Sequence, residues 1–358
     1  MSPLIHHYGW SDALQQSFQT HADAGLSPAR VIVQQRGPYR IISDAGELRA
    51  DVSGRLLHGA GDGDMPVAGD WVAAALRPEE GAATIHAVLP RTSAFIRKAA
   101  GRAGHAQVVA ANADIALLTA SLNADLNLRR LERFLASAWE SGATPLIVLT
   151  KADLCDTIAE HVAEVQAIAP GVAVHAVSAM SGAGMEALAG AIGTGRTAVL
   201  LGSSGAGKST LLNSLAGEER MATRDIREHD ARGRHTTTHR ELVLLKSGAL
   251  LLDTPGMREL GLWDAEEGVS TTFADIEGLA AACRFGDCRH VTEPGCAVRA
   301  ALEGGTLAPE RWQSFEKLQR ELAHETRKGD YFARVQQKKL WAGRHKAYRA
   351  LVKAREQE

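Results

Sequence analysis

Apolar and polar residues follow different patterns in successive parts of the chain. Near the amino terminus, Trp10, Leu14 and Phe18 recur at helical spacing before Pro28, which predicts a helical extension over residues 1–29. A barrel is predicted next, because short apolar and β-branched runs are separated by Gly, Pro and Asp across residues 30–92. The barrel is OB-fold-like in strand number, although other small barrels share this pattern. The predicted strands lie at residues 30–35, 39–43, 47–52, 70–76 and 83–89.

The rest of the chain predicts two further domains. Residues 93–105 are basic and rich in Gly and Ala, and we interpret them as a linker. In residues 106–269 apolar strands alternate with helical stretches, which predicts a mostly parallel sheet with helices on both faces. Residues 270–358 are helical in pattern and contain a Cys/His cluster. The predicted fold is therefore multidomain α/β, with a barrel first and a helical domain last.

Composition narrows the class of protein. The chain has 358 residues, 45% of them hydrophobic, which suits about two or three domains with sizeable cores. Its formal net charge is −2, so any nucleic-acid surface must be local. The sequence predicts neither a secretory signal nor a membrane-spanning segment. Four cysteines in a chain of this length favour a reduced, cytoplasmic protein over a disulfide framework.

A phosphate-binding motif is the clearest chemical signal. GSSGAGKS at residues 202–209 matches G-x-x-x-x-G-K-[ST], follows an apolar strand and opens an apparent helix. Backbone N–H groups of such a loop surround the β-phosphate. Lys208 would reach the β- and γ-phosphates, and the hydroxyl of Ser209 would bind Mg²⁺. The predicted phosphate-binding residues are Gly202, Ser203, Ser204, Gly205, Ala206, Gly207, Lys208, Ser209 and Thr210.

A second apolar strand, at residues 249–252, leads into the sequence DTPG. Asp253 would hold Mg²⁺ through water, and the backbone N–H of Gly256 would contact the γ-phosphate. Because that contact exists only with a triphosphate, the loop can sense hydrolysis. The pattern D-x-x-G alone is common in proteins. It indicates a nucleotide site here because it follows a phosphate loop in the chain.

Base recognition is predicted at two other strand ends. In TKAD, at residues 150–153, the carboxylate of Asp153 can accept hydrogen bonds from guanine N1–H and the exocyclic amine, which adenine does not offer. Lys151 would lay its aliphatic stem over the base. The SAM sequence at residues 178–180 would present N–H groups to guanine O6. The predicted base-binding residues are Thr150, Lys151, Ala152, Asp153, Ser178 and Ala179.

Thr150 departs from the usual N-K-x-D form of this motif. The Asn of that form carries an amide that braces neighbouring loops, and threonine lacks this amide. We therefore expect the substitution to affect nucleotide affinity more than selectivity for guanine. The alternative interpretation is that TKAD is an ordinary polar loop after a strand.

The order of the motifs indicates a circular permutation. In an ordinary GTPase the phosphate loop comes first, whereas here residues 150–153 and 178–180 precede residues 202–209. A permuted chain can build the same sheet, because domain termini often lie close together. The segment after Gly256 then leads into the carboxy-terminal region, and we hypothesise that nucleotide state is transmitted to that region. Identical orientations of residues 270–358 in GTP and GDP complexes in solution would refute this hypothesis.

A compact set of soft ligands lies in residues 283–296. Three thiolates and one imidazole suit tetrahedral Zn²⁺, and filling all four positions indicates a structural ion rather than a catalytic one. The alternative is buried free thiols beside a surface histidine. The candidate ligands are Cys283, Cys288, His290 and Cys296.

The chain closely resembles one family in three features taken together. These are the permuted GTPase motifs, the small barrel and the sequence CRFGDCRHVTEPGCAV at residues 283–298. The family is the bacterial ribosome small-subunit-dependent GTPase A family (RsgA, also called YjeQ). The resemblance covers nearly the whole chain and includes PVAGDWV at residues 66–72 and GRHTTTH at residues 233–239. It implies an OB-fold barrel and GTP hydrolysis stimulated by the small ribosomal subunit. It also implies a monomer that acts as a switch in late maturation of that subunit.

The same resemblance assigns switch I to residues 233–238. One of Thr236, Thr237 and Thr238 would reach Mg²⁺ in the GTP state. We take Thr237 as the candidate magnesium ligand, although the sequence does not distinguish the three. Met257 follows Gly256, where many GTPases carry a water-orienting Gln, so intrinsic turnover should be slow. His235 is a candidate substitute, although a loop histidine is more often simply solvated. Unchanged subunit-stimulated turnover in His235→Ala would exclude it.

The carboxy-terminal tail predicts an RNA-facing surface. Residues 326–355 contain ten Lys and Arg against one acid, Asp330, with aromatic residues interleaved. Basic residues neutralise phosphates and aromatic rings stack on unpaired bases, so we predict contact with rRNA. The alternative is a solvated helical face with its aromatics packed inward. Deletion of an rRNA-binding tail would lower subunit affinity and flatten its salt dependence.

These patterns favour a GTPase that acts as an assembly factor on the small ribosomal subunit. One alternative is an essentially non-catalytic rRNA-binding module or chaperone whose binding is controlled by nucleotide. This alternative stays open because Met257 stands where many GTPases carry the water-orienting Gln. Another is a GTPase with a different RNA or protein client. Lys208, Ser209 and Asp253 favour hydrolysis over the gated module.

Overall fold

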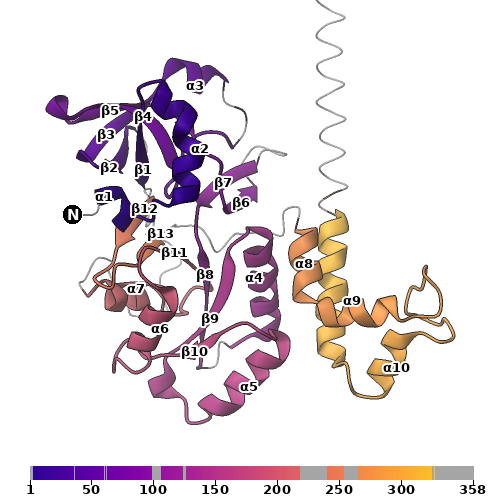
Figure 1. The fold of residues 1–358 in the computed structure, drawn as a ribbon. Coiled ribbons are helices and arrows are strands. Elements are labelled where there is room, and N and C mark those ends of the chain that lie inside the picture. Colours follow the sequence, from indigo (N-terminus) through magenta and orange to yellow (C-terminus); the bar gives the residue numbers. More distant parts are fainter. Residues whose placement is uncertain are drawn as a thin grey trace, which may run out of the picture.

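The computed structural model arranges a barrel, a sheet-and-helix domain and a helical region in the predicted order (Figure 1). The predicted switch residues 233–238, Gly256, Met257 and the basic tail beyond residue 326 lie outside the described part of the chain. No helix in the described part is long and apolar enough to cross a membrane. The structure describes residues 3–35, 37–59, 61, 63–98, 106–123, 126–217, 240–253, 265–324 and 326.

The amino-terminal extension packs onto the barrel through aromatic rings. It consists of α1 (Leu4–His7) and α2 (Asp12–Asp23), and the Ser11 hydroxyl caps α2 by accepting the N–H of Leu14. Trp10 and Phe18 are buried, and their ring centroids lie 5.8 Å apart. Trp10 also meets the barrel residue Trp71 at 4.8 Å. The helical spacing in the sequence therefore reflects one contact surface.

The barrel has the five strands that the sequence predicts, with ends shifted by a few residues. They lie in the order β1-β2-β3-β5-β4, and β4 pairs with β1 to close the barrel. Its core contains small and β-branched residues such as Ala29, Val31 and Ile85. The elements are β1 (Ser27–Gln34), β2 (Tyr39–Ser43), β3 (Gly46–Val52), α3 (Gly54–Gly59), β4 (Trp71–Arg77), η1 (Pro78–Glu80) and β5 (Ala82–Val88).

The interpretation of residues 93–105 as a linker is wrong for its first part. Residues Ala94–Lys98 form β6, which pairs antiparallel with β7 (Ala106–Ala111) in a separate two-stranded sheet. The Phe95 side chain on β6 is only 1% exposed and joins the core of the central domain. Burial of this ring fixes the strand despite the surrounding basic and small residues.

In its described residues, the central domain is a sheet with two helices on each face. Its strand order is β10-β9-β8-β11-β13-β12, parallel except for β12. Along β8, Leu118 packs in the core beneath α4 and α5, and Leu117 packs in the opposite core beneath α6 and α7. The strands are β8 (Ile115–Ser121), β9 (Thr144–Thr150), β10 (Val174–Ala176), β11 (Thr197–Gly202), β12 (Arg240–Leu244) and β13 (Leu250–Asp253). The helices are α4 (Leu128–Glu140), α5 (Ile158–Ile168), α6 (Met185–Ile192) and α7 (Lys208–Ala216).

The barrel and the central domain share one hydrogen-bonded sheet. Strand β12 pairs with β1 at Glu241 and Arg240, opposite Val33 and Gln34, so the sheet continues from the central domain into the barrel. Beside this pairing, the guanidinium of Arg30 is buried in the junction. It donates to the carbonyls of Gly69 at 3.1 Å and Asn112 at 3.1 Å, and also to that of Tyr8.

The carboxy-terminal region docks on α4, which lies next to α8 in Figure 1. It comprises α8 (Glu266–Thr272), α9 (Ala274–Ala281), α10 (Ala297–Glu303) and a helix through residues 309–324. The Arg311 guanidinium joins the two domains. It pairs with Asp275 at 2.7 Å and with Glu132 of α4 at 2.9 Å, and it donates to the carbonyls of Thr272 and Ile168.

Candidate nucleotide-binding and metal sites

The phosphate loop lies between β11 and α7, as the motif requires. Gly207, the residue before the helix, has a left-handed backbone with φ 80°. The Lys208 ammonium donates to the carbonyl of Gly202 at 2.7 Å and to that of Ser203. The loop and the N-terminus of α7 therefore form a turn of backbone amides of the kind that holds phosphate oxygens.

Two further loops follow the neighbouring strands β9 and β10. In the TKAD loop Lys151 has φ 60° and leads into the short helix η2 (Ala152–Leu154), where Asp153 is exposed. The N–H of Ala152 donates to the carbonyl of Val177 at 3.1 Å, which ties this loop to the SAM loop. The edge of the sheet thus brings together both predicted base-recognition loops.

The SAM loop is fixed by the buried residue Ser178, which is 1% exposed. Its hydroxyl accepts the N–H of Ser181 at 3.1 Å, and its own N–H donates to the carbonyl of Ala183 at 2.9 Å. These bonds close a tight turn after β10. The turn sets the direction of the backbone that the sequence assigns to guanine O6.

Thr150 connects the TKAD loop to the phosphate loop. Its buried hydroxyl lies 2.8 Å from the carbonyl oxygen of Ala206 and 3.2 Å from that of Ala120. The sequence led us to expect that the loops lose a brace when Thr replaces Asn. Thr150 lacks that amide, but its hydroxyl contacts the phosphate loop at Ala206. No signal in the sequence alone could have revealed this contact, because the two residues are 56 positions apart.

The structure brings some predicted site residues together and leaves others outside its described part. Asp253 ends β13, which pairs with the phosphate-loop strand β11, so it lies one strand away from the loop. The remaining catalytic candidates, His235, Thr237 and Gly256, fall outside the described residues. The described part of the site thus contains the phosphate loop, the two loops predicted to recognise the base, and Asp253, the carboxylate predicted to hold Mg²⁺ through water.

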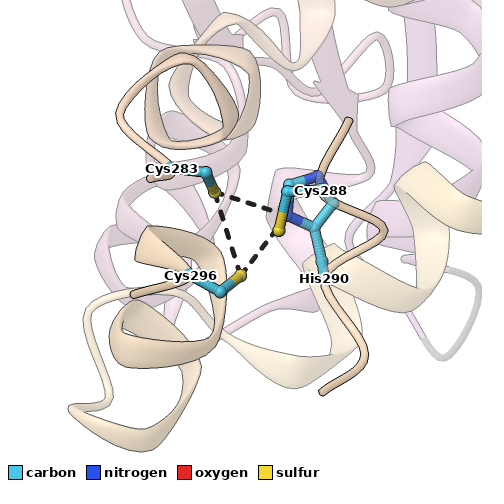
Figure 2. A group of neighbouring side chains, drawn as sticks. All are labelled: Cys283, Cys288, His290 and Cys296. Carbon is cyan, nitrogen blue, oxygen red and sulfur yellow. Dashed lines mark hydrogen bonds between the residues drawn. The ribbon is translucent and has the colours of Figure 1, made fainter. Parts of the chain in front are cut away.

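The four candidate metal ligands converge in the carboxy-terminal region (Figure 2). Their ligand atoms all lie within 4.8 Å of one another. The Sγ atoms of Cys283 and Cys296 are 3.8 Å apart, and His290 Nδ1 is 3.4 Å from Cys296 Sγ. A tetrahedral ion with Zn–S bonds of about 2.3 Å requires sulfur atoms separated by roughly 3.8 Å. The Cys₃His cluster is therefore compatible in chemistry and geometry with zinc.

The loop that carries His290 is shaped by an acidic side chain. Glu293 accepts the backbone N–H groups of Arg289 at 3.1 Å, Val291 at 2.9 Å and Thr292 at 3.0 Å. Backbone hydrogen bonds, first the one from its own N–H, lower the pKa of Glu293 to about 2. The carboxylate thus remains charged near neutral pH and holds the turn next to the cluster.

The fold and the site define a circularly permuted P-loop nucleotide-binding protein of the GTPase class. The two loops predicted to recognise the base and the phosphate loop follow strands of one sheet, and the two predicted base loops come first in the chain. A sequence model of the RsgA GTPase family matches residues 88–263. "Small ribosomal subunit biogenesis GTPase RsgA" of Opitutus terrae is 48% identical over 94% of this chain and 95% of its own length. The chain therefore belongs to the RsgA GTPase family.

Two solved structures support the same assignment. YjeQ from Thermotoga maritima matches with a TM-score of 0.64 and 25% identity, over 83% of this chain and 99% of that one. YloQ, described as a circularly permuted GTPase, matches with a TM-score of 0.60 and 25% identity, over 84% of this chain and 96% of that one. The similarity extends beyond the central domain.

Proposed function

We propose that this chain binds GTP at the carboxyl edge of the central sheet and hydrolyses it as a switch in late maturation of the small ribosomal subunit. The observation that carries the proposal is the meeting of the phosphate loop with the TKAD loop through Thr150 and Ala206. The relative from Opitutus terrae, named as a small ribosomal subunit biogenesis GTPase, supports the biological role.

The residues at this edge suit distinct tasks. The Asp153 carboxylate selects guanine, and Lys151 covers the base. Lys208 offers its ammonium to the β- and γ-phosphates, and the Ser209 hydroxyl and the Asp253 carboxylate are oxygen donors of the kind that Mg²⁺ prefers. When bound, Mg²⁺ neutralises charge on the phosphate oxygens. His235, Thr237 and Gly256 remain sequence-based candidates for switch roles, and Met257 suggests that a partner completes the site.

The carboxy-terminal region has a separate role in the proposal. Cys283, Cys288, His290 and Cys296 would hold one structural Zn²⁺. The basic residues 327–355 would contact rRNA of the small subunit. A cytoplasmic monomer fits these roles, because a maturation factor must reach free subunits.

The proposal is tested by GTP turnover of the purified chain, alone and with added small ribosomal subunits, with ATP as the control nucleotide. We expect slow turnover alone and strong stimulation by the subunit, specific to GTP. Lys208→Ala, which removes the phosphate-facing ammonium, should abolish stimulation. Nucleotide binding without stimulated turnover would favour the gated rRNA-binding module or a GTPase with another client.

A further inference from the structure

We propose that Trp312 is a positioning residue that holds the His290 imidazole in place for the metal of the Cys₃His cluster. This inference deepens the zinc site of the proposed function, on which it rests. His290 Nδ1 faces two of the thiols, 3.4 Å from Cys296 Sγ and 3.6 Å from Cys283 Sγ (Figure 2). The same ring meets the Trp312 indole edge-on, with centroids 5.6 Å apart and planes inclined at 83°. Edge-to-face packing is a favourable arrangement of aromatic rings.

The backbone of His290 is held in a conformation that its surroundings must support. Its φ is +61°, in the left-handed region that residues with a side chain adopt only rarely. The Glu293 carboxylate accepts the N–H groups of Arg289 and Val291, on either side of His290, and so fixes the path of the chain. These bonds place the Cα atom of His290, but they do not determine how its imidazole is rotated.

The rotation of the imidazole therefore needs a contact of its own. In most metal-binding histidines the second ring nitrogen donates a hydrogen bond that orients the ring. Among the side chains that the structure describes, His290 forms hydrogen bonds only through Nδ1, the nitrogen that faces the thiols. The edge-on contact with Trp312 supplies an orienting interaction on the protein side of the ring.

Trp312 can act in this way because its own helix is fixed. It belongs to the helix through residues 309–324, packs against the core of the carboxy-terminal region and contacts Phe315 at 5.7 Å between ring centroids. The preceding residue, Arg311, ties this helix to Glu132 of α4 at 2.9 Å. An imidazole packed on a fixed ring has less freedom to lose when the metal binds, and preorganisation of this kind raises affinity.

Three variants separate the ring beside His290 from packing in general. Trp312→Leu removes the ring, and Trp312→Phe keeps an aromatic one. Phe315→Leu is a matched control, since Phe315 lies in the same helix and its ring contacts those of Trp312 and Phe273. For each full-length variant, competition with a chromogenic chelator measures zinc affinity. The visible absorption bands of the Co²⁺-loaded chain report which ligands surround the metal.

We expect Trp312→Leu to lower zinc affinity about tenfold, the lower end of the loss seen when a residue that orients a ligand is removed. Its Co²⁺ bands should shift, because the imidazole leaves the metal for part of the time. Trp312→Phe should recover most of the affinity and the wild-type bands, and Phe315→Leu should retain both. If Trp312→Leu does not fold, Trp312→Met makes the same comparison.

A double-mutant cycle tests whether Trp312 acts through the imidazole. His290→Cys replaces the ring by a thiol and keeps four ligands for the metal. In this background Trp312→Leu should change zinc affinity less than twofold, roughly the error of such a cycle, because there is no ring left to orient.

Three results would overturn the inference. Equal affinity losses in Trp312→Leu and Phe315→Leu would assign the effect to packing of the core. Unchanged Co²⁺ bands in Trp312→Leu, or a full tenfold loss in the His290→Cys background, would show that Trp312 does not act through His290. A wild-type chain that binds neither Zn²⁺ nor Co²⁺ would instead refute the proposed zinc site, so the two failures are distinguishable.

Discussion

The barrel and the carboxy-terminal region are joined to the central domain in different ways, although each junction contains one buried arginine. Arg30, at the barrel junction, directs its donors to the backbone carbonyls of Gly69, Asn112 and Tyr8. Arg311, at the carboxy-terminal junction, meets two carboxylates, those of Asp275 and Glu132. The first arginine meets neutral backbone acceptors, and the second meets opposite charges on separate helices in addition to the carbonyls of Thr272 and Ile168.

The two arginines differ electrostatically as a result. Burial lowers the pKa of Arg30 to about 10, and the more distant charges of Asp114 and Asp70 offset this only in part. Burial also lowers the pKa of Arg311, but the hydrogen bonds and charges of Asp275 and Glu132 outweigh it and the pKa is raised. The barrel junction therefore depends on backbone geometry, whereas the carboxy-terminal junction depends on charge.

Metal removal should produce the largest difference in stability between the carboxy-terminal region and the barrel with its central sheet. If Zn²⁺ fills the Cys₃His cluster, chelation should unfold the region around α9 and α10, because structural zinc contributes on the order of 10 kcal/mol in small zinc domains. The barrel and the central sheet should stay folded. Hydrogen exchange before and after chelation measures both regions in one experiment. Equal protection of α10 in both states would contradict the prediction.

Replacement of Arg311 should have the next largest effect. Arg311→Met leaves the Glu132 carboxylate, 2% exposed, buried without its cation, which costs about 3–5 kcal/mol. The free energy of unfolding from urea titration measures this loss. The double variant Arg311→Met with Glu132→Gln removes both charges and should recover part of the stability. A double variant no more stable than the single one would mean that charge is not the cause.

Two glycines provide a matched pair across the junctions. A Cβ on Gly69 would lie 2.2 Å from the carbonyl oxygen of Ala111, and one on Gly268 would lie 2.1 Å from that of Ala136. Each Gly→Ala change should cost about 1–3 kcal/mol through overpacking. Gly69 also has φ +95°, which adds roughly 1–2 kcal/mol for a left-handed alanine. Urea unfolding should therefore rank Gly69→Ala as the more damaging variant, and the reverse order would contradict this account.

Acid should weaken the carboxy-terminal junction, and the effect should be the smallest of the four. Burial raises the pKa of Asp275, but Arg311 lowers it more, so it lies below the ordinary value of about 3.9. A lowered carboxyl pKa contributes stability above the unfolded value and loses it as the pH falls through the folded value. Glu132 acts in the opposite direction, because burial raises its pKa despite Ser314 and Arg311.

Asp275→Asn isolates this contribution from that of Glu132. The stability difference between wild type and variant should be constant above about pH 5 and shrink below about pH 4, the range set by the ordinary carboxyl pKa. The carbonyl acceptors of Arg30 do not titrate, so its hydrogen bonds should persist in this range. A difference that does not change with pH would show that the Asp275 pKa is not lowered.

The sequence predicts those parts of this protein whose chemistry is local. Strand patterns locate the barrel, and the glycines before Lys208 locate the phosphate loop, because a strand, a turn and a helix start must follow one another there. The Cys/His spacing likewise predicts the cluster around Cys296, since its ligands come from one short segment.

Contacts between distant residues are not visible in one sequence. Arg30 reaches Asn112 across 82 positions, and Arg311 reaches Glu132 across 179. An arginine on its own predicts exposure, and only the partners supplied by the fold make burial tolerable. Phe95 shows the same limit, because a short run among basic and small residues gives no strand signal until the ring has a core to enter.

The pairing of β12 with β1 has a consequence for how the protein can be divided. Without residues 1–92, β12 would keep β13 on one side but lose β1 on the other. It would then present a free row of backbone donors and acceptors to solvent. Exposed edge strands of this kind recruit strands from other molecules. A truncated central domain should therefore self-associate, and light scattering of the purified fragment measures this directly. Self-association of the fragment would show that the barrel also acts as a cap on the edge strand β12.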